Sequence, residues 1–171
     1  MKAALALALT LSAGAARSER RWVVEPGQAL ITLDADAYSA FSSRLSGHLE
    51  ERADGSIRLE LRVPLRSFTS GNPGQDRNLP RDGEIVFLLT APKPGKDAAL
   101  DLDGTLVFGK VARQGRFRFT MTRTDAMSFA HSVVNVNLRS FGFQVPAGMD
   151  DTARIELDTG LRQDPARTSR G

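Results

Sequence analysis

Hydrophobic and polar residues alternate with a period of two along most of the chain, a pattern typical of strands that bury one face. The clearest run is 56–63, in which every second residue from Ile57 to Val63 is aliphatic and the others are polar. The segment 84–90 is apolar on both faces, so we expect burial on both sides or contact with an apolar lumen. The same pattern predicts further strands at 22–34, 43–50, 100–108, 116–123, 133–139 and 153–161.

Segments that contain glycine and proline separate the predicted strands, with turns expected at 53–55, 92–95, 114–115 and 146–148. Residues 64–83 have no periodicity and contain three prolines, which predicts a long excursion with one helical turn. Eight strands and no long helical pattern indicate an antiparallel sheet with an apolar interior. Either a closed barrel or a two-sheet sandwich satisfies this pattern. An eight-stranded barrel has room for one small ligand.

The first 16 residues have the three parts of a secretory signal peptide. Lys2 supplies a positive charge, residues 3–11 form a short apolar region, and Ala13 and Ala15 form a cleavage site. We therefore expect an exported protein with one β-domain over 17–161 and a flexible polar tail over 162–171. No later stretch reaches the roughly 18 apolar residues that a membrane helix needs.

Composition narrows the possible functions. The chain of 171 residues is 41% hydrophobic and 25% charged, as expected for a single globular domain. The absence of cysteine excludes a disulfide scaffold, a thiolate zinc site and a cysteine nucleophile. The 23 basic and 20 acidic residues are interspersed, which gives a net charge of +3 without a basic block. We therefore expect no nucleic-acid partner.

One motif resembles an enzyme signature. The sequence Asp101-Leu102-Asp103-Gly104-Thr105 matches the nucleophile motif of haloacid-dehalogenase-like phosphatases. In that chemistry both carboxylates project from a loop at the end of a buried parallel strand, beside Mg²⁺. Here the two aspartates lie on the polar face of an alternating strand, and no helical pattern follows. A phosphatase is therefore a remote alternative, and the solvated face of a strand is the favoured interpretation.

Other catalytic or metal-binding patterns are missing from the sequence. His48 and His131 are the only histidines, and neither belongs to a pair with metal-ligand spacing. No G-x-S-x-G nucleophile elbow and no phosphate-binding glycine loop is present. We therefore expect neither catalytic residues nor a metal or cofactor.

Several short motifs, taken in order over residues 22–161, resemble the YceI-like family of secreted bacterial proteins. Each motif alone has low specificity, and the ordered set is moderately specific. The sequence departs from the family at Gln75 and Asn78, which replace the Arg and His of the family's R-D-x-H-L motif. The motifs are Trp22-Val23-Val24-Glu25-Pro26 with Leu30–Leu33, Gly47-His48-Leu49 with Gly55-Ser56-Ile57, Leu65–Thr69 with Gln75–Leu79, Leu102–Leu106, and Leu138–Phe143 with Ile155-Glu156-Leu157.

The resemblance implies a single antiparallel, eight-stranded, lipocalin-like barrel in the periplasm that binds an isoprenoid or another amphiphile in an apolar lumen. Such a ligand needs little directional chemistry, since burial of each CH₂ contributes about 0.8 kcal/mol. Aromatic residues are equally common in packed cores, so the inward positions fit either role. The candidate lumen residues are Ile31, Leu33, Phe87, Phe108, Phe117, Phe119 and Phe141.

The divergent 64–83 excursion motivates an alternative function. A surface loop that has lost a ligand motif is free to serve recognition. On this alternative the protein is a ligand-free β-module that contacts another envelope protein or forms a homodimer. A close-packed interior favours this module, whereas a cavity of several hundred Å³ favours the lipid carrier.

Overall fold

The computed structural model describes residues 19–36, 38–77, 79–92, 99–124, 126–145 and 147–164. The predicted signal peptide, residues 1–16, lies outside this part of the chain, and so does the predicted tail beyond Asp164. Among the described residues, no helix is long and apolar enough to cross a membrane. The strands are β1 (Arg20–Ala35), β2 (Tyr38–Ser42), β3 (Ser46–Glu51), β4 (Ile57–Pro64), β5 (Glu84–Ala91), β6 (Ala99–Gly109), β7 (Val111–Arg123), β8 (Met127–Asn137) and β9 (Thr152–Gln163).

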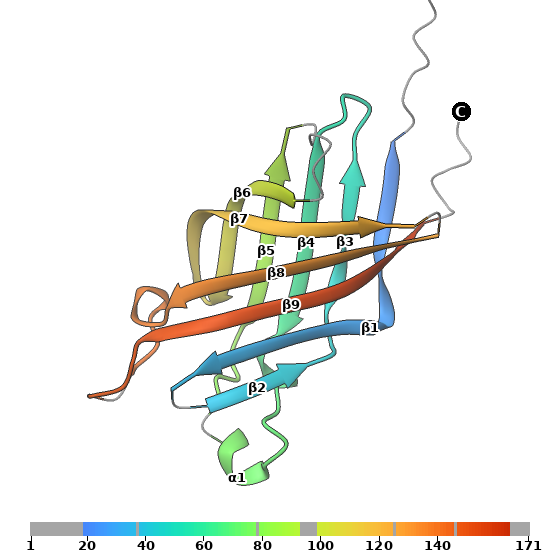
Figure 1. Ribbon diagram of the computed structural model, residues 1–171. Coiled ribbons are helices and arrows are strands. Elements are labelled where there is room, and N and C mark those ends of the chain that lie inside the picture. The colour runs from blue at the N-terminus through green and yellow to red at the C-terminus, as the bar shows by residue number, and fades with distance from the viewer. Residues whose placement is uncertain are drawn as a thin grey trace, which may run out of the picture.

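The strands form one antiparallel sheet that closes on itself, because β1 pairs with β9 at the end of the series β3 to β9. Figure 1 shows β7, β8, β9 and the second half of β1 crossing in front of β3, β4 and β5. Strands β2 and β3 pair with the same edge of β1, β2 along its second half and β3 along its first. Together they count as one interrupted strand, so the predicted eight-stranded antiparallel barrel is confirmed.

Strand β1 changes the face that it buries halfway along its length. Trp22 and Val24 point inward in the first half, whereas Ala29, Ile31 and Leu33 do so in the second. The register with β9 shifts between Val24 and Ala29, where Gly27 has a φ of 81°. A bulge of this kind lets even-numbered residues face inward before it and odd-numbered residues after it. Without the bulge, the apolar side chains of one half of the strand would point outward.

Two glycines permit close approach between neighbouring strands. A Cβ atom on Gly47 would lie 2.0 Å from the carbonyl oxygen of Glu60, and one on Gly104 would lie 2.1 Å from that of Leu88. Both glycines also have positive φ, 141° and 159°. No other residue type fits either position without a backbone shift, which explains the glycines of the Gly47-His48-Leu49 and Leu102–Leu106 motifs.

The 64–83 excursion contains a 3₁₀ turn, η1 (Leu65–Ser67), and one turn of α-helix, α1 (Pro73–Asp76), as predicted. It lies at one end of the barrel, beside β2 (Figure 1). Two backbone hydrogen bonds between Phe41 and Thr69, of 2.9 and 3.0 Å, fasten it to β2. Its side chains Leu65, Phe68 and Leu79 are buried in the core. The excursion therefore covers this end of the barrel.

The carboxylate of Asp76 organises the excursion. Ser70 donates to its Oδ1 from both the hydroxyl and the backbone N–H, at 2.6 Å each, and Thr69 Oγ1 donates to Oδ2 at 2.7 Å. These bonds, with those from Ser70 the largest cause, lower the pKa of Asp76 to about 2. Arg81 completes the fold of the segment by donating to the carbonyl oxygens of Arg66, Phe68 and Asp76.

Two of the expected strands have different bounds in the structure. The strand predicted at 43–50 begins at Ser46, and a separate strand, β2, precedes it. The strand predicted at 133–139 runs from Met127 to Asn137 and is followed by the 3₁₀ turn η2 (Arg139–Phe141). The Asn137 side chain stops the strand, because its Oδ1 accepts a hydrogen bond from the Ser140 N–H at 2.9 Å.

The turn expected at 114–115 is also corrected, and of the two alternatives for 84–90, burial on both sides holds only in part. The β6–β7 turn lies at Gly109 and Lys110, where the positive φ of Gly109 suits a two-residue hairpin loop. Gly115 instead lies inside β7, paired with Gly104. In β5, Val86 is buried on the outer side, but Leu88 is 36% exposed, so only part of the outer face is covered.

Candidate functional site

The barrel interior contains all seven of the predicted lumen residues. Ile31 and Leu33 come from β1, Phe87 from β5, Phe108 from β6, and Phe117 and Phe119 from β7. Phe141 comes from η2 rather than from a strand. All seven are buried and belong to one continuous hydrophobic cluster. The structure thus places them together, and their contact with a ligand stays a prediction.

Three of these phenylalanines form an aromatic cluster in the middle of the barrel. The ring of Phe87 lies edge-on to Phe117, with centroids 5.9 Å apart, and edge-on to Phe119, with centroids 6.1 Å apart. Strands β5 and β7 are not direct neighbours in the sheet, since both pair with β6, which lies between them. The rings therefore meet over the inward face of β6. Edge-to-face contacts of this kind are favourable and present ring faces and edges to an apolar neighbour.

Phe108 and Phe141 belong to one end of the barrel, which we call the Phe108 end. The ring of Phe108 lies 4.6 Å from that of Phe143 and 5.8 Å from that of Phe141, centroid to centroid. The turn η2 and the residues after it therefore pack into this end, beside the buried side chains of the excursion. The Phe108 end is consequently closed by apolar side chains.

A recess passes between β7 and β8. The two strands pair only from Phe119 to Arg123 on β7 and from Ser128 to Ser132 on β8, so they separate over their remaining lengths. The recess has a volume of about 480 Å³ and reaches inward-facing Phe117 and Phe141, while Arg113 and Arg116 lie at its rim. The aromatic cluster is thus accessible at Phe117 through the barrel wall.

The opposite end, which we call the Trp22 end, has a polar margin. An ion pair joins Arg123, the last residue of β7, to Glu51, the last residue of β3. Because three strands separate β7 from β3, this pair crosses the end of the barrel. Arg21 and Glu50 form a second, longer ion pair at the same margin, 3.8 Å between Nη1 and Oε1. Charged groups therefore lie where the Phe108 end has apolar ones.

The carboxylates of the phosphatase-like motif form ion pairs on the outer wall. Asp101 accepts two hydrogen bonds from Arg118, at 2.9 and 3.1 Å, and Asp103 accepts two from Arg116, at 2.7 and 3.1 Å. The arginines lower the pKa of both carboxyls, chiefly through these hydrogen bonds. Strand β6 is antiparallel to both of its neighbours, so the motif lacks the parallel-strand context that the phosphatase chemistry requires.

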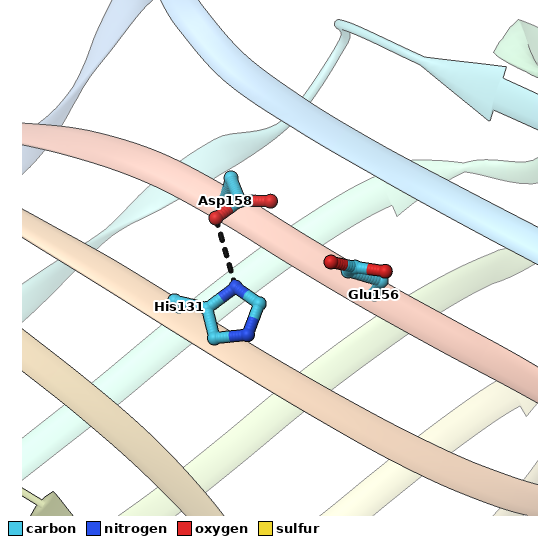
Figure 2. A group of neighbouring side chains, drawn as sticks. All are labelled: His131, Glu156 and Asp158. Carbon is cyan, nitrogen blue, oxygen red and sulfur yellow. Dashed lines mark hydrogen bonds and ion pairs between the residues drawn. The ribbon is translucent and has the colours of Figure 1, made fainter.

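The structure also brings together a group of possible metal ligands that the sequence analysis did not find. His131 of β8 lies beside Glu156 and Asp158 of β9 on the outer wall (Figure 2). His131 Nδ1 is 2.8 Å from Asp158 Oδ1, and Arg154 Nη1 is 2.5 Å from Glu156 Oε2. The donor types suit a divalent metal, but both carboxylates already have a basic partner. We interpret the group as surface hydrogen bonding and ion pairing. His131 is 25 residues from Glu156 and 27 from Asp158, so no short sequence motif contains the group.

The sequence matches no protein-family model and none of the curated proteins. Several solved structures resemble this one, including the following two. The crystal structure of BcnA from Burkholderia cenocepacia matches with a TM-score of 0.69 and 13% identity, over 80% of this chain and 98% of BcnA. A polyisoprenoid-binding domain from Saccharophagus degradans, implicated in plant cell wall breakdown, matches with a TM-score of 0.61 and 12% identity. That match covers 84% of this chain and 98% of the domain.

The chain shares the fold of both proteins. At these identities the likeness establishes the lipocalin-like barrel fold and supports the resemblance of the chain to the YceI-like family. The likeness concerns the fold and assigns no role to an individual residue.

Proposed function

We propose that the protein binds a lipid-like molecule, an isoprenoid or another amphiphile, inside the barrel, and that it carries or sequesters this molecule in the bacterial periplasm. The observation that carries the proposal is the aromatic cluster of Phe87, Phe117 and Phe119 in a continuous apolar interior. The neighbour described as a polyisoprenoid-binding domain supports it. On this proposal the protein is a binding protein and not an enzyme.

The energetics of such binding follow from the apolar character of the interior. Each CH₂ transferred from water contributes about 0.8 kcal/mol, so ten of them contribute roughly 8 kcal/mol before the cost of ordering the ligand. The inward faces of strands β4 to β7 present aliphatic and aromatic side chains to the alkyl chain of such a ligand. The recess between β7 and β8 adds about 480 Å³ beside Phe117, which is in the size range of small-molecule sites.

A titration tests the proposal directly. The protein is unfolded and refolded to remove bound lipid, and a long-chain prenol is then added from cyclodextrin. Trp22, the only tryptophan, lies in the core and reports on the interior through its fluorescence. Saturable binding with a stoichiometry near one supports the proposal. Absence of any saturable change, checked by native mass spectrometry, contradicts it.

The outer wall supports a second candidate function, a β-module that docks on another envelope protein. Leu30 of β1 and Phe129 of β8 are each 44% exposed. Both line a shallow groove of about 330 Å³ that also includes His131 and Asp158. Exposed apolar side chains beside a polar rim are typical of interaction sites. Loss of an envelope partner in a Phe129→Asp variant, with lipid binding intact, would favour this candidate.

A further inference from the structure

Two polar atoms inside the barrel have no hydrogen-bond partner. Trp22 Nε1 and Ser128 Oγ are both buried, and their residues are only 4% and 2% exposed. Buried polar groups are nearly always hydrogen-bonded, because an unpaired one forfeits its bond with water. Arg21 Nε is the remaining buried atom of this kind in the described part of the chain, and it belongs to a guanidinium that faces Glu50 at the margin.

The two atoms belong to the same end of the barrel. Trp22 is paired with Gln163 of β9, and Ser128 is paired with Leu161 of the same strand. Both side chains are on the inward faces of the strands that flank β9. Ser128 is also paired with Arg123 of β7, whose ion pair with Glu51 crosses this end. The unpaired atoms therefore lie just inside the charged margin of the Trp22 end.

The surrounding wall is built from small side chains. Ala130 and Ser132 follow Ser128 on the inward face of β8, and Ala29 and Thr159 occupy inward positions on β1 and β9. Ser132 Oγ donates to the carbonyl oxygen of Arg118 at 2.8 Å, so this buried serine has a partner where Ser128 has none. The inward side chains of this part of the wall are thus smaller than the phenylalanines of β5, β6 and β7.

We propose that the Trp22 end holds the polar head of the bound lipid, with Trp22 Nε1 and Ser128 Oγ donating hydrogen bonds to an oxygen of that head. This inference rests on the proposed lipid-binding function and names the chemistry of the ligand. Indole N–H donates only, so the ligand must offer an acceptor. The charges of Arg123 and Arg21 at this margin are already balanced, because Arg123 is paired with Glu51 and Arg21 with Glu50. A neutral hydroxyl, ether or carbonyl oxygen fits this environment.

The head at the Trp22 end sets the direction of the ligand. Its apolar chain extends from Trp22 toward the aromatic cluster of Phe87, Phe117 and Phe119, because the Phe108 end is closed. A pure hydrocarbon of the same length buries the same chain but leaves both polar atoms unpaired. The structure therefore assigns the protein to oxygen-bearing amphiphiles rather than to hydrocarbons.

The test compares geranylgeraniol with the hydrocarbon that lacks its hydroxyl group. Both are titrated into delipidated wild type, Trp22→Phe, Ser128→Ala and Ser132→Ala, with native mass spectrometry as a readout that does not depend on tryptophan. Wild type is expected to bind the alcohol about tenfold more tightly, which corresponds to about 1.4 kcal/mol. Trp22→Phe and Ser128→Ala are expected to reduce this preference and to leave hydrocarbon binding unchanged. Ser132→Ala is the matched control and keeps the preference, since its serine bonds elsewhere.

The possible outcomes separate the two proposals. Equal binding of alcohol and hydrocarbon by wild type overturns the head site while the lipid-binding function stands. An equal preference in wild type and in both variants also overturns it. Binding of neither lipid overturns the proposed function, and the head site falls with it. Circular dichroism and thermal unfolding confirm that each variant is folded before its binding is compared.

Discussion

The ring of Phe87 lies edge-on to that of Phe119, with centroids 6.1 Å apart and planes at 88°. Strands β5 and β7 both pair with β6, so the two rings meet over the inward face of β6. The contact thus joins two next-nearest strands of the wall and forms one side of the aromatic cluster in the apolar interior. Its properties lead to the first prediction.

A charge in the aromatic cluster is expected to abolish lipid binding. Phe117 is the best position, because its ring contacts Phe87 and also lines the recess between β7 and β8. A carboxylate there must be desolvated when an apolar chain binds, which opposes burial by several kcal/mol. We expect Phe117→Asp to lose saturable prenol binding, measured by native mass spectrometry.

The matched control places the same charge on the outer wall. Phe129 is on the neighbouring strand β8 but is exposed on the outer face. Phe129→Asp is expected to bind prenol as wild type does. Equal binding by wild type and by a folded Phe117→Asp variant would show that this face does not contact the ligand.

The low pKa of Asp76 predicts a pH-dependent contribution to stability. Its folded pKa of about 2 lies below the usual value of 3.8 for an aspartate, so the folded state favours the charged carboxylate. The contribution is therefore present above pH 3.8 and is lost as the pH falls toward 2. We expect Asp76→Asn to lower the free energy of unfolding at pH 7, and the difference from wild type to shrink below pH 3.8. Urea unfolding of both proteins at several pH values measures this, and a difference independent of pH contradicts it.

The close contact at Gly47 predicts a large loss of stability when this glycine is replaced. In Gly47→Ala, the new Cβ meets the Glu60 carbonyl oxygen at 2.0 Å, so the paired strands must shift. We expect this change to destabilise the fold by about 3 kcal/mol or more. Gly27→Ala is the control, because Gly27 also has positive φ but has nothing within 4 Å of the new Cβ. It is expected to cost only the backbone strain, about 1 kcal/mol. Similar urea midpoints for the two variants would refute the explanation.

The ion pairs of Asp101 and Asp103 predict that the protein has no phosphatase activity. Both carboxylates form two hydrogen bonds with an arginine on the outer wall. Neither is free to attack phosphorus, and we expect no hydrolysis of a generic phosphate ester above background. Asp101→Asn is expected to behave as wild type. Activity in wild type that this substitution removes would restore the phosphatase alternative.

The fold was largely predictable from local patterns, since period-two alternation depends on each strand alone. The predicted strand boundaries were wrong where the inward side chains are small or polar. The first half of β8 contains Ser128, Ala130 and Ser132 on its inward face, which carry little hydrophobic signal. Likewise β2 is a short strand that owes its pairing to β1 and to the bridge between Phe41 and Thr69. Such segments become strands through their neighbours.

The candidate site was predictable in part for the same reason. Alternation correctly placed the phenylalanines of β6 and β7 inside, because one face of each strand is polar. It could not find Trp22 and Ser128 as a pair, since residues 22 and 128 meet only through their common partner strand β9. Nor could it reveal that both atoms lack partners, which depends on every group packed around them.

The most direct test of the account is native mass spectrometry of the gently purified protein, followed by organic extraction of the bound material. We predict a stoichiometric adduct that extracts as an isoprenoid or another amphiphile with a neutral oxygen. An apo mass from the gentle preparation, unchanged after incubation with added prenol, would contradict lipid binding and favour the docking module.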